Sequence, residues 1–514
     1  MEVKPSLVKR ALAIVLIVVG AAAFARYRRE RSERELGPGR PLPRSLGAGA
    51  SPVATAASPV PAAGSHLARD STDRTGGEAL AQPRPPRRRL PRRALLLAAG
   101  LALVLAAGAA AGWFLHVRTA GRDVVGSPSV EFVTTAGPAA VTTTPAATAP
   151  ARPTLPPVIW PTYGLDNRRL RTFPGGPKPP FRTLWSYRGG SLLEFPPTLA
   201  YGRLTISTNR GRLVSLDAAT GKARWTFESG RCVAASPAVA NRVVYASFMN
   251  RPPCNASGSA LDGQVVAFDA LTGKVRWRAT VGVNESSPLV AGGLVTVGDW
   301  NGDVTALDAR TGVQRWRFHT GGKVKGAPAL ADGRLVIGSY DGAVYALDPQ
   351  TGALLWKASS QERIGSRGTF YATAALAFGR VYIGATDGKV YSFGAESGKL
   401  RWSQSTGGYV YASAAIWRQS VLVGSYSGSF FSLDAATGAV NWRFRAPGPI
   451  SGSAVVIGDV VYVATLARTT YALDAATGKL LWTFPDGQYG AAITDGTHLY
   501  LVGTTRLYAM VPRG

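Results

Sequence analysis

Residues able to bind an acidic ligand recur along the C-terminal part of the chain, each near the start of a run of small residues. Lysine and arginine donate charge-assisted hydrogen bonds to carboxylates, and tyrosine adds an aromatic face that carries a hydroxyl. The residues that we predict to bind a ligand are Glu194, Asn284, Glu285, Lys323, Lys325, Arg363, Arg367, Tyr371, Tyr411 and Tyr489. The alternative is a solvated rim that binds nothing specific.

Metal and catalytic chemistry receive little support from residue types. Asn284 and Glu285 are the only suggestion of a Ca²⁺ pair, and two oxygen ligands are far short of the six or more that Ca²⁺ takes. Four histidines and two cysteines exclude a multi-cysteine zinc domain, an iron–sulfur ferredoxin and a disulfide-dense scaffold. We therefore assign no metal site and no catalytic residue.

The elements that must position these residues come from an internal repeat. Seven segments share the pattern A/S-x-D-x-x-T-G-x-x-x-W, with SFGAESGKLRW as the most divergent copy. A repeat of about 40 residues that contains several short strands predicts a β-propeller. The tryptophans that end the seven segments are Trp225, Trp277, Trp316, Trp356, Trp402, Trp442 and Trp482.

Each repeat unit predicts four strands. In the unit that ends near Trp356, these are Gly326–Ala331, Arg334–Ser339, Val344–Leu347 and Leu354–Lys357, separated by turns rich in Asp and Gly. The small residues of the first strand suit the crowded axis of a propeller. Residues just before such a strand are therefore expected to face the mouth of the central channel.

The blade count is eight. After Trp482 three more strands follow without a fourth, and Phe181–Tyr187 supplies a candidate with Trp185 at the repeat spacing. Joining N-terminal and C-terminal strands in one blade would close the ring and remove free sheet edges. Seven blades is the alternative. We expect all eight tryptophans to be structural and to pack between neighbouring blades.

The two cysteines belong to the longest repeat unit. Fifty-two residues separate Trp225 from Trp277, and the extra residues, 248–263, contain Cys254, while Cys232 precedes a small-residue strand. Both are expected near one face, where they would pair outside the cytoplasm. Two free buried thiols are the alternative. Asn255-Ala256-Ser257 is a glycosylation triplet of a kind that also occurs by chance.

The first 157 residues do not repeat. Residues 1–25 contain an uncharged stretch, Ala11–Ala25, that fits a signal-like segment or a first transmembrane helix, and residues 26–93 are basic and predict disorder. Ala94–Val117 is uncharged and long enough for a transmembrane helix, with a buried soluble helix as the alternative. Residues 118–157, rich in Thr, Pro and Ala, predict a linker, and residues 158–514 the propeller.

The basic residues predict an orientation. Six arginines from Arg84 to Arg93 precede Ala94–Val117, and only Arg118 and Arg122 follow closely. The positive side of a span stays in the cytoplasm. We therefore expect residues 26–93 to be cytoplasmic. The protein would lie in the cell membrane, crossing it once or twice, with the propeller on the extracytoplasmic side.

The formal net charge of +28 does not by itself indicate nucleic acid. The positive charge is spread over the chain, and no nucleic-acid-binding motif accompanies it. We therefore expect no nucleic-acid partner.

The repeated motif is similar to the tryptophan-docking repeat of the pyrroloquinoline-quinone (PQQ) propeller family, over about residues 181–512. That family includes quinoprotein alcohol dehydrogenases, which the resemblance implies would hold PQQ on Ca²⁺, and non-enzymatic BamB-like proteins. The adjacent cysteines typical of quinoprotein alcohol dehydrogenases are missing here, and their Glu, Asn and Asp ligand positions cannot be matched. The lipidated N-terminal cysteine of BamB-like proteins is also missing, since no cysteine precedes Cys232.

Two functions follow from this resemblance. The first is a membrane-anchored, extracytoplasmic propeller that binds a protein or an envelope polymer without catalysis and without a cofactor. The second is a PQQ-dependent oxidoreductase whose site lies at the channel mouth, with PQQ and Ca²⁺ as cofactors. The missing catalytic set favours the first.

Overall fold

The computed structural model describes residues 100, 102, 105–110, 121–134, 155–254, 262–363, 366–490 and 492–514. By its internal contacts the chain divides into two units, Met1–Arg89 and Leu90–Gly514. All described residues belong to the second unit.

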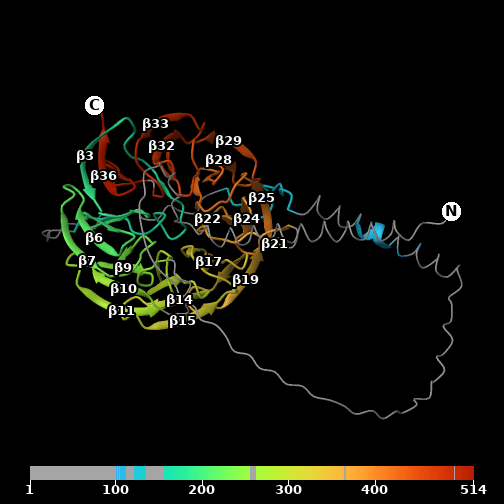
Figure 1. The fold of residues 1–514 in the computed structure, drawn as a ribbon, viewed down its shortest axis with the longest axis horizontal. Helices are drawn as coiled ribbons and strands as arrows, with labels where there is room; N and C mark the ends of the chain where they lie inside the picture. Colours follow the sequence, from blue (N-terminus) through green and yellow to red (C-terminus); the bar gives the residue numbers. More distant parts are fainter. Residues whose placement is uncertain are drawn as a thin grey trace, which may run out of the picture. The chain divides into compact units, whose positions relative to one another are not determined.

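Residues 158–514 form a β-propeller of eight four-stranded antiparallel blades, as predicted (Figure 1). Blade 1 consists of β4 (Thr198–Ala200), β5 (Arg203–Ser207), β6 (Arg212–Asp217) and β7 (Ala223–Glu228). Blade 2 consists of β8 (Ala238–Ala240), β9 (Val243–Phe248), β10 (Gly263–Asp269) and β11 (Val275–Val281). Blade 3 consists of β12 (Leu289–Ala291), β13 (Leu294–Gly298), β14 (Asp303–Asp308) and β15 (Gln314–His319). Blade 4 consists of β16 (Ala329–Ala331), β17 (Arg334–Gly338), β18 (Ala343–Leu347) and β19 (Leu354–Ser359).

The next three blades repeat this arrangement. Blade 5 consists of β22 (Ala375–Ala377), β23 (Arg380–Gly384), β24 (Lys389–Gly394) and β25 (Leu400–Ser405). Blade 6 consists of β26 (Ala415–Trp417), β27 (Ser420–Gly424), β28 (Ser429–Asp434) and β29 (Val440–Arg445). Blade 7 consists of β30 (Val455–Ile457), β31 (Val460–Thr465), β32 (Thr469–Asp474) and β33 (Leu480–Phe484). A hairpin of β20 (Glu362–Arg363) and β21 (Ser366–Arg367) links blades 4 and 5.

Blade 8 closes the ring with strands from both ends of the propeller. It contains β34 (Ala492–Thr494), β35 (Leu499–Val502) and β36 (Arg506–Pro512), with β3 (Phe181–Arg188) as its outer strand. β3 pairs with β36 along its whole length, from Phe181 opposite Pro512 to Arg188 opposite Arg506, and the two lie side by side in Figure 1. The predicted N-terminal and C-terminal closure is therefore confirmed.

The repeated tryptophans join each blade to the next. The Trp225 indole N–H donates to the Ala270 carbonyl oxygen at 3.1 Å, across the boundary between blades 1 and 2. The same bond recurs from Trp277, Trp316, Trp356, Trp402 and Trp442 to Ala309, Pro349, Ala395, Ala435 and Ala475. In blades 7 and 8 the rings make other contacts: Trp482 packs on Phe181 with ring centroids 5.3 Å apart, and Trp185 faces Tyr500 at 6.1 Å.

A plug segment, residues 158–173, lies against the inner strands at the axis of the propeller. It begins with β1 (Val158–Trp160), which pairs with β4, and ends with β2 (Thr172–Phe173), which runs parallel to β30. Between them, its carbonyl oxygens accept hydrogen bonds from the inner-strand amides of Val239, Leu330, Leu376, Ile416 and Val456. The plug therefore binds the inner strands of most blades, a role that the sequence did not predict.

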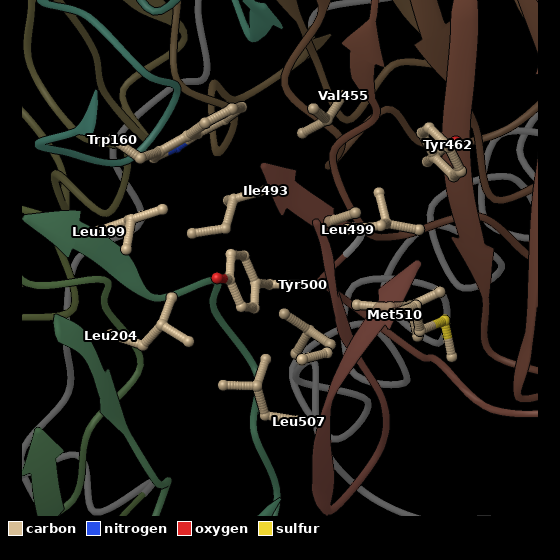
Figure 2. Packing of buried hydrophobic residues seen from close by; sticks show 14 of the residues in the cluster. Trp160, Leu199, Leu204, Val455, Tyr462, Ile493, Leu499, Tyr500, Leu507 and Met510 are labelled. Atoms are coloured by element: carbon tan, nitrogen blue, oxygen red, sulfur yellow. The ribbon is translucent and has the colours of Figure 1, made fainter. Parts of the chain in front are cut away.

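The largest apolar cluster lies where the ring closes. Figure 2 shows Trp160 from the plug above Leu199 and Leu204 of blade 1, with Val455 of blade 7 and Ile493 of blade 8 beside them. Because the cluster draws on the plug and three blades, closure buries apolar surface as well as pairing strands.

A second N-terminal piece, the docked segment (Asp123–Val133), packs against blades 5 and 6. The Val124 and Ser403 backbones exchange hydrogen bonds of 3.1 and 3.0 Å, so the segment extends the outer edge of β25. Glu131 forms an ion pair with Arg401, and the ring centroids of Phe132 and Phe378 are 5.3 Å apart. Part of the predicted linker is thus fixed against the propeller.

The predicted membrane location is wrong by the structure. Among the described residues, no helix is long and apolar enough to cross a membrane. Of Ala94–Val117, the structure describes residues 100, 102 and 105–110. The remainder of that segment, and the whole of Ala11–Ala25 and residues 26–93, lie outside the described residues.

Candidate functional site

The channel mouth contains a buried ion pair. Glu285 and Lys325 lie just before the inner strands of blades 3 and 4, and Lys325 Nζ is 2.5 Å from Glu285 Oε1. Each side chain is only 9 % exposed. The Trp300 indole N–H also donates to Glu285 Oε1, at 2.8 Å. Two donors therefore hold this carboxylate in one orientation.

The lysines of the mouth lie against aromatic rings. Lys323 Nζ and Lys325 Nζ are each 4.4 Å from the centre of the Trp300 ring. Lys325 Nζ is also 5.5 Å from the Tyr340 ring and 5.6 Å from the Tyr371 ring. Burial and the neighbouring Lys325 charge lower the pKa of Lys323. Cation–π contact with Trp300 therefore offsets part of the repulsion between the neighbouring Lys323 and Lys325 ammonium groups.

Tyrosines continue from this pair around the mouth. The Tyr371 ring is 6.4 Å from Tyr340 and 5.2 Å from Tyr411, and Tyr411 is 5.0 Å from Tyr426. The last two contacts are edge-to-face. Burial, with the nearby charges of Glu285 and Glu194, raises the pKa of Tyr371 well above its ordinary value. The cluster therefore presents neutral hydroxyls and aromatic edges.

Glu194 and Tyr489 complete the mouth from blades 1 and 8. Burial and the Glu285 charge raise the pKa of Glu194 to about 7, and Lys325 partly opposes this rise. Burial and the Glu194 charge raise the pKa of Tyr489 to about 12. The mutual influence of these groups places them in one electrostatic neighbourhood, although they come from four blades.

Two predicted ligand-binding residues, Asn284 and Arg367, do not join this cluster. Asn284 is fully buried, where its amide donates to Ser247 Oγ at 3.2 Å and its Oδ1 accepts from the Ser286 N–H. Arg367 pairs with Glu362 at 3.0 Å in the β20–β21 hairpin. The Arg363 side chain lies outside the described residues.

The long unit of blade 2 is tied together at the same end. Cys232 and Cys254 form a disulfide with Cα atoms 5.5 Å apart, and Arg231 forms a 2.9 Å ion pair with Asp262. Residues 255–261, which include the glycosylation triplet, lie outside the described residues. The disulfide and the ion pair therefore tie Cys254 and Asp262 of this insertion to the residues before β8.

Sequence reasoning missed three aromatic residues of the mouth. Trp300, Tyr340 and Tyr426 lie in the turns between the second and third strands of blades 3, 4 and 6, each two residues before a glycine. A comparison of repeats at this turn position would have found them. The predicted residues all precede inner strands, whereas these three lie in turns, although both sets converge on one end of the channel.

The mouth does not match the Ca²⁺ and PQQ site that the family resemblance implies. Glu285 is already bound by Lys325 and Trp300, and the Asn284 oxygen is used by the backbone of its own loop. In the described part of the chain, no group of three or more His, Cys, Asp or Glu side chains is placed to hold a metal ion. Ca²⁺ takes six to eight oxygen ligands, so these residues do not fit the ion.

The fold and the tryptophan contacts define an eight-bladed propeller of PQQ-like repeats. The family model described as outer membrane protein assembly factor BamB matches residues 182–252, 261–419 and 408–514. Because this covers more than half of the sequence, the chain belongs to that family. Among curated proteins, none matches the chain significantly in sequence.

Solved structures share the fold at low sequence identity. BamB from Moraxella catarrhalis is 19 % identical and has a TM-score of 0.53, with 65 % of this chain and 100 % of that chain covered. Quinohemoprotein alcohol dehydrogenase from Comamonas testosteroni is 15 % identical and has a TM-score of 0.58, with 69 % and 81 % covered. The computationally designed Ika8 protein is 16 % identical and has a TM-score of 0.54, with 64 % and 98 % covered. These similarities concern the fold alone.

Proposed function

We propose that the propeller is a non-catalytic module that binds a protein at its channel mouth. The observation that carries this proposal is the cluster of Tyr371, Tyr411 and Tyr426 beside the buried Lys325–Glu285 pair. Tyrosine gives a large contact area and a hydrogen bond at low entropic cost, and aromatic residues dominate the energetics of protein interfaces.

The chemistry of the mouth supports binding more than turnover. A catalytic acid or base needs a proton that is accessible to a substrate, whereas Glu285 is held by two donors and Lys325 by a carboxylate and three rings. Membership of a family described as an assembly factor supports a protein partner. We extend that role to this chain as a proposal.

Photo-crosslinking in the source cells tests the proposal. A benzophenone side chain at Tyr409, which is 39 % exposed at the mouth, should give one discrete protein adduct. The same group at Val313 should give no adduct. Val313 is 61 % exposed and lies in the turn between β14 and β15 of blade 3, away from the mouth. Loss of the adduct when Tyr371 and Tyr411 are replaced by alanine would support the mouth as the binding site. Equal adducts at both positions, or none at Tyr409, would contradict it.

A quinone-dependent oxidoreductase is the second candidate, favoured by the fold shared with quinohemoprotein alcohol dehydrogenase. Calorimetric titration of the purified chain with PQQ plus Ca²⁺, followed by an alcohol-dependent dye-reduction assay, separates the two functions. Saturable one-to-one binding with turnover would replace our proposal. Absence of both would leave the binding module.

A further inference from the structure

The start of the third strand in a blade is opposite the end of the fourth strand, and this position carries charge in several blades. The register places Arg212 opposite Glu228 in blade 1, and Asp303 opposite His319 in blade 3. In blade 5 the position is Lys389, opposite Ser405. These side chains occupy the same position in the strand register of their blades, so the charges around them can be compared directly.

The charge at this position is balanced in blades 1, 3 and 5. Arg212 Nε is 2.6 Å from Glu228 Oε1. Asp303 accepts from Arg317 at 3.5 Å and lies 2.8 Å from His319 Nδ1. In blade 5 the balancing carboxylate comes from the docked segment.

In blade 5 an extended piece of chain brings the acid. Asp123 of the docked segment lies 2.9 Å from Lys389 Nζ and accepts from Ser405 Oγ at 2.7 Å. The next residue, Val124, pairs with Ser403 of β25. The docked segment therefore shows how an aspartate in an extended segment can pair with a cation beside an outer strand.

Blade 6 has the cations but not the acid. Ser429 replaces the carboxylate, and its hydroxyl accepts from Arg443 Nε at 3.2 Å, Arg443 Nη2 at 2.8 Å and Arg445 Nη1 at 3.1 Å. A serine oxygen has two lone pairs and no charge. Within the described ranges no carboxylate pairs with either guanidinium, in contrast to Arg317 of blade 3.

A cavity of about 660 Å³ lies at these arginines, between the end of β25 and the outer strands of blade 6. Ser405, which already binds Asp123, and Ser427 supply hydroxyls to its wall, and Phe431 and Val440 supply apolar surface. The Arg443 guanidinium lies 5.4 Å from the Phe431 ring centre. Such stacking holds the planar fork in position for a carboxylate.

We propose that this cavity binds the carboxylate of an acidic side chain in an extended segment of a partner protein. The neighbouring Asp123 provides the pattern, the two arginines provide the unbalanced charge, and the net charge of +28 favours an acidic partner. The site lies on the outer strands of blade 6, so it does not depend on the function proposed for the channel mouth.

The test measures fluorescence anisotropy of the full chain with a labelled hexapeptide of threonine and valine that carries one central aspartate. The matched peptide carries asparagine instead. We expect the aspartate peptide to bind about tenfold more tightly, as a charge-assisted hydrogen bond implies. Ser429→Asp, which copies blade 3, should abolish this preference, and Arg443→Gln or Arg445→Gln should weaken binding of the aspartate peptide about tenfold.

Two controls make the result specific. Arg317→Gln in blade 3 and Arg212→Gln in blade 1, where Asp303 and Glu228 already balance the charge, should each leave peptide binding unchanged. Equal binding of both peptides, or full binding by the Ser429→Asp chain, would overturn the proposal. Ser429-dependent binding of an oligothymidylate in place of the peptide would also overturn it, in favour of a phosphate ligand.

Discussion

At the channel mouth, Glu194 carries a pKa of about 7, raised by burial and by Glu285 from an ordinary value of 4.5. Between these two values the folded state binds more protons than the unfolded state, so the free energy of unfolding falls as pH rises. Glu194→Gln removes this loss. Urea denaturation should show the variant gaining stability relative to wild type between pH 5 and pH 8. The exposed Glu396→Gln is the control, and an identical pH profile for wild type and Glu194→Gln would contradict the prediction.

The Lys325–Glu285 pair allows a second test on single residues. Removal of one partner leaves a buried charge uncompensated, so Lys325→Met should lower the free energy of unfolding by about 3 kcal/mol. The double variant Glu285→Gln, Lys325→Met should recover part of that loss, because neither charge then remains. Chemical denaturation of wild type, Lys325→Met, Glu285→Gln and the double variant measures these values. A double variant less stable than the sum of the two single changes would refute the ion-pair explanation.

Part of the mouth could be predicted from residue types alone. Residues before a small inner strand face the axis, which brought Glu285, Lys325 and Tyr371 together in the prediction as in the structure. Side-chain direction could not be predicted in the same way. Asn284 is the neighbour of Glu285, yet its amide turns into the framework because buried loop donors and acceptors need partners.

At the scale of the elements, the repeated glycine in the turn before each outer strand meets two requirements, a positive φ and close packing against a tryptophan ring. Gly352 has φ of +73°, and a Cβ there would lie 2.6 Å from the Trp316 ring. Gly333 has φ of +71°, with nothing within 4 Å of such a Cβ. Gly333→Ala should therefore cost about 1 kcal/mol from the backbone alone, and Gly352→Ala about 1–3 kcal/mol more. Equal losses on chemical denaturation would mean that the tryptophan contact does not require glycine.

Arg380 binds the middle of the docked segment by donating to the carbonyl oxygens of Glu131, Ser127 and Val130. Arg380→Met should release it and speed hydrogen exchange about tenfold at the amides of Val124 and Val133, since loss of such bonds costs over 1 kcal/mol. The matched control is Arg334→Met, the same strand position in blade 4. Unchanged exchange in the Arg380 variant would show that the segment is held by other contacts.

The docked segment and the plug show why some elements escape sequence analysis. The repeat was visible because glycine, aspartate and tryptophan recur at fixed spacing. The plug turns instead at Leu165, Arg169 and Arg171, with φ of 77°, 63° and 57°, where turn rules expect glycine. Its conformation is imposed by hydrogen bonds to the inner strands, which no local pattern encodes.

For the whole molecule, stability depends on closing a ring whose two ends are far apart in sequence. β3 and β36 close it at the outer edge, while the plug joins inner strands from blade 1 to blade 7 at the axis. Non-local pairing of this kind is slow to form, because the loop must close before the contacts stabilise it. The plug adds contacts that only a closed ring can make.

Two buried arginines of the plug differ in how well they are paired, and this difference can be measured. The Arg169 guanidinium donates to the carbonyl oxygens of Pro288, Pro328 and Tyr163 and to Thr162 Oγ1. Arg169→Met would leave the carbonyl oxygens of Pro328 and Tyr163 without this donor and should cost about 2–4 kcal/mol. Arg171 Nη1 donates to the carbonyl oxygens of Arg169 and Ala414, but Nε and Nη2 have no hydrogen-bond partner, and the guanidinium lies 4.5 Å from the Tyr163 ring centre. Arg171→Met removes an incompletely paired buried charge, so its stability should stay within about 1 kcal/mol of wild type. Urea denaturation compares the two, and an equal loss for Arg171→Met would show that those two nitrogens are satisfied by water or an anion in the channel.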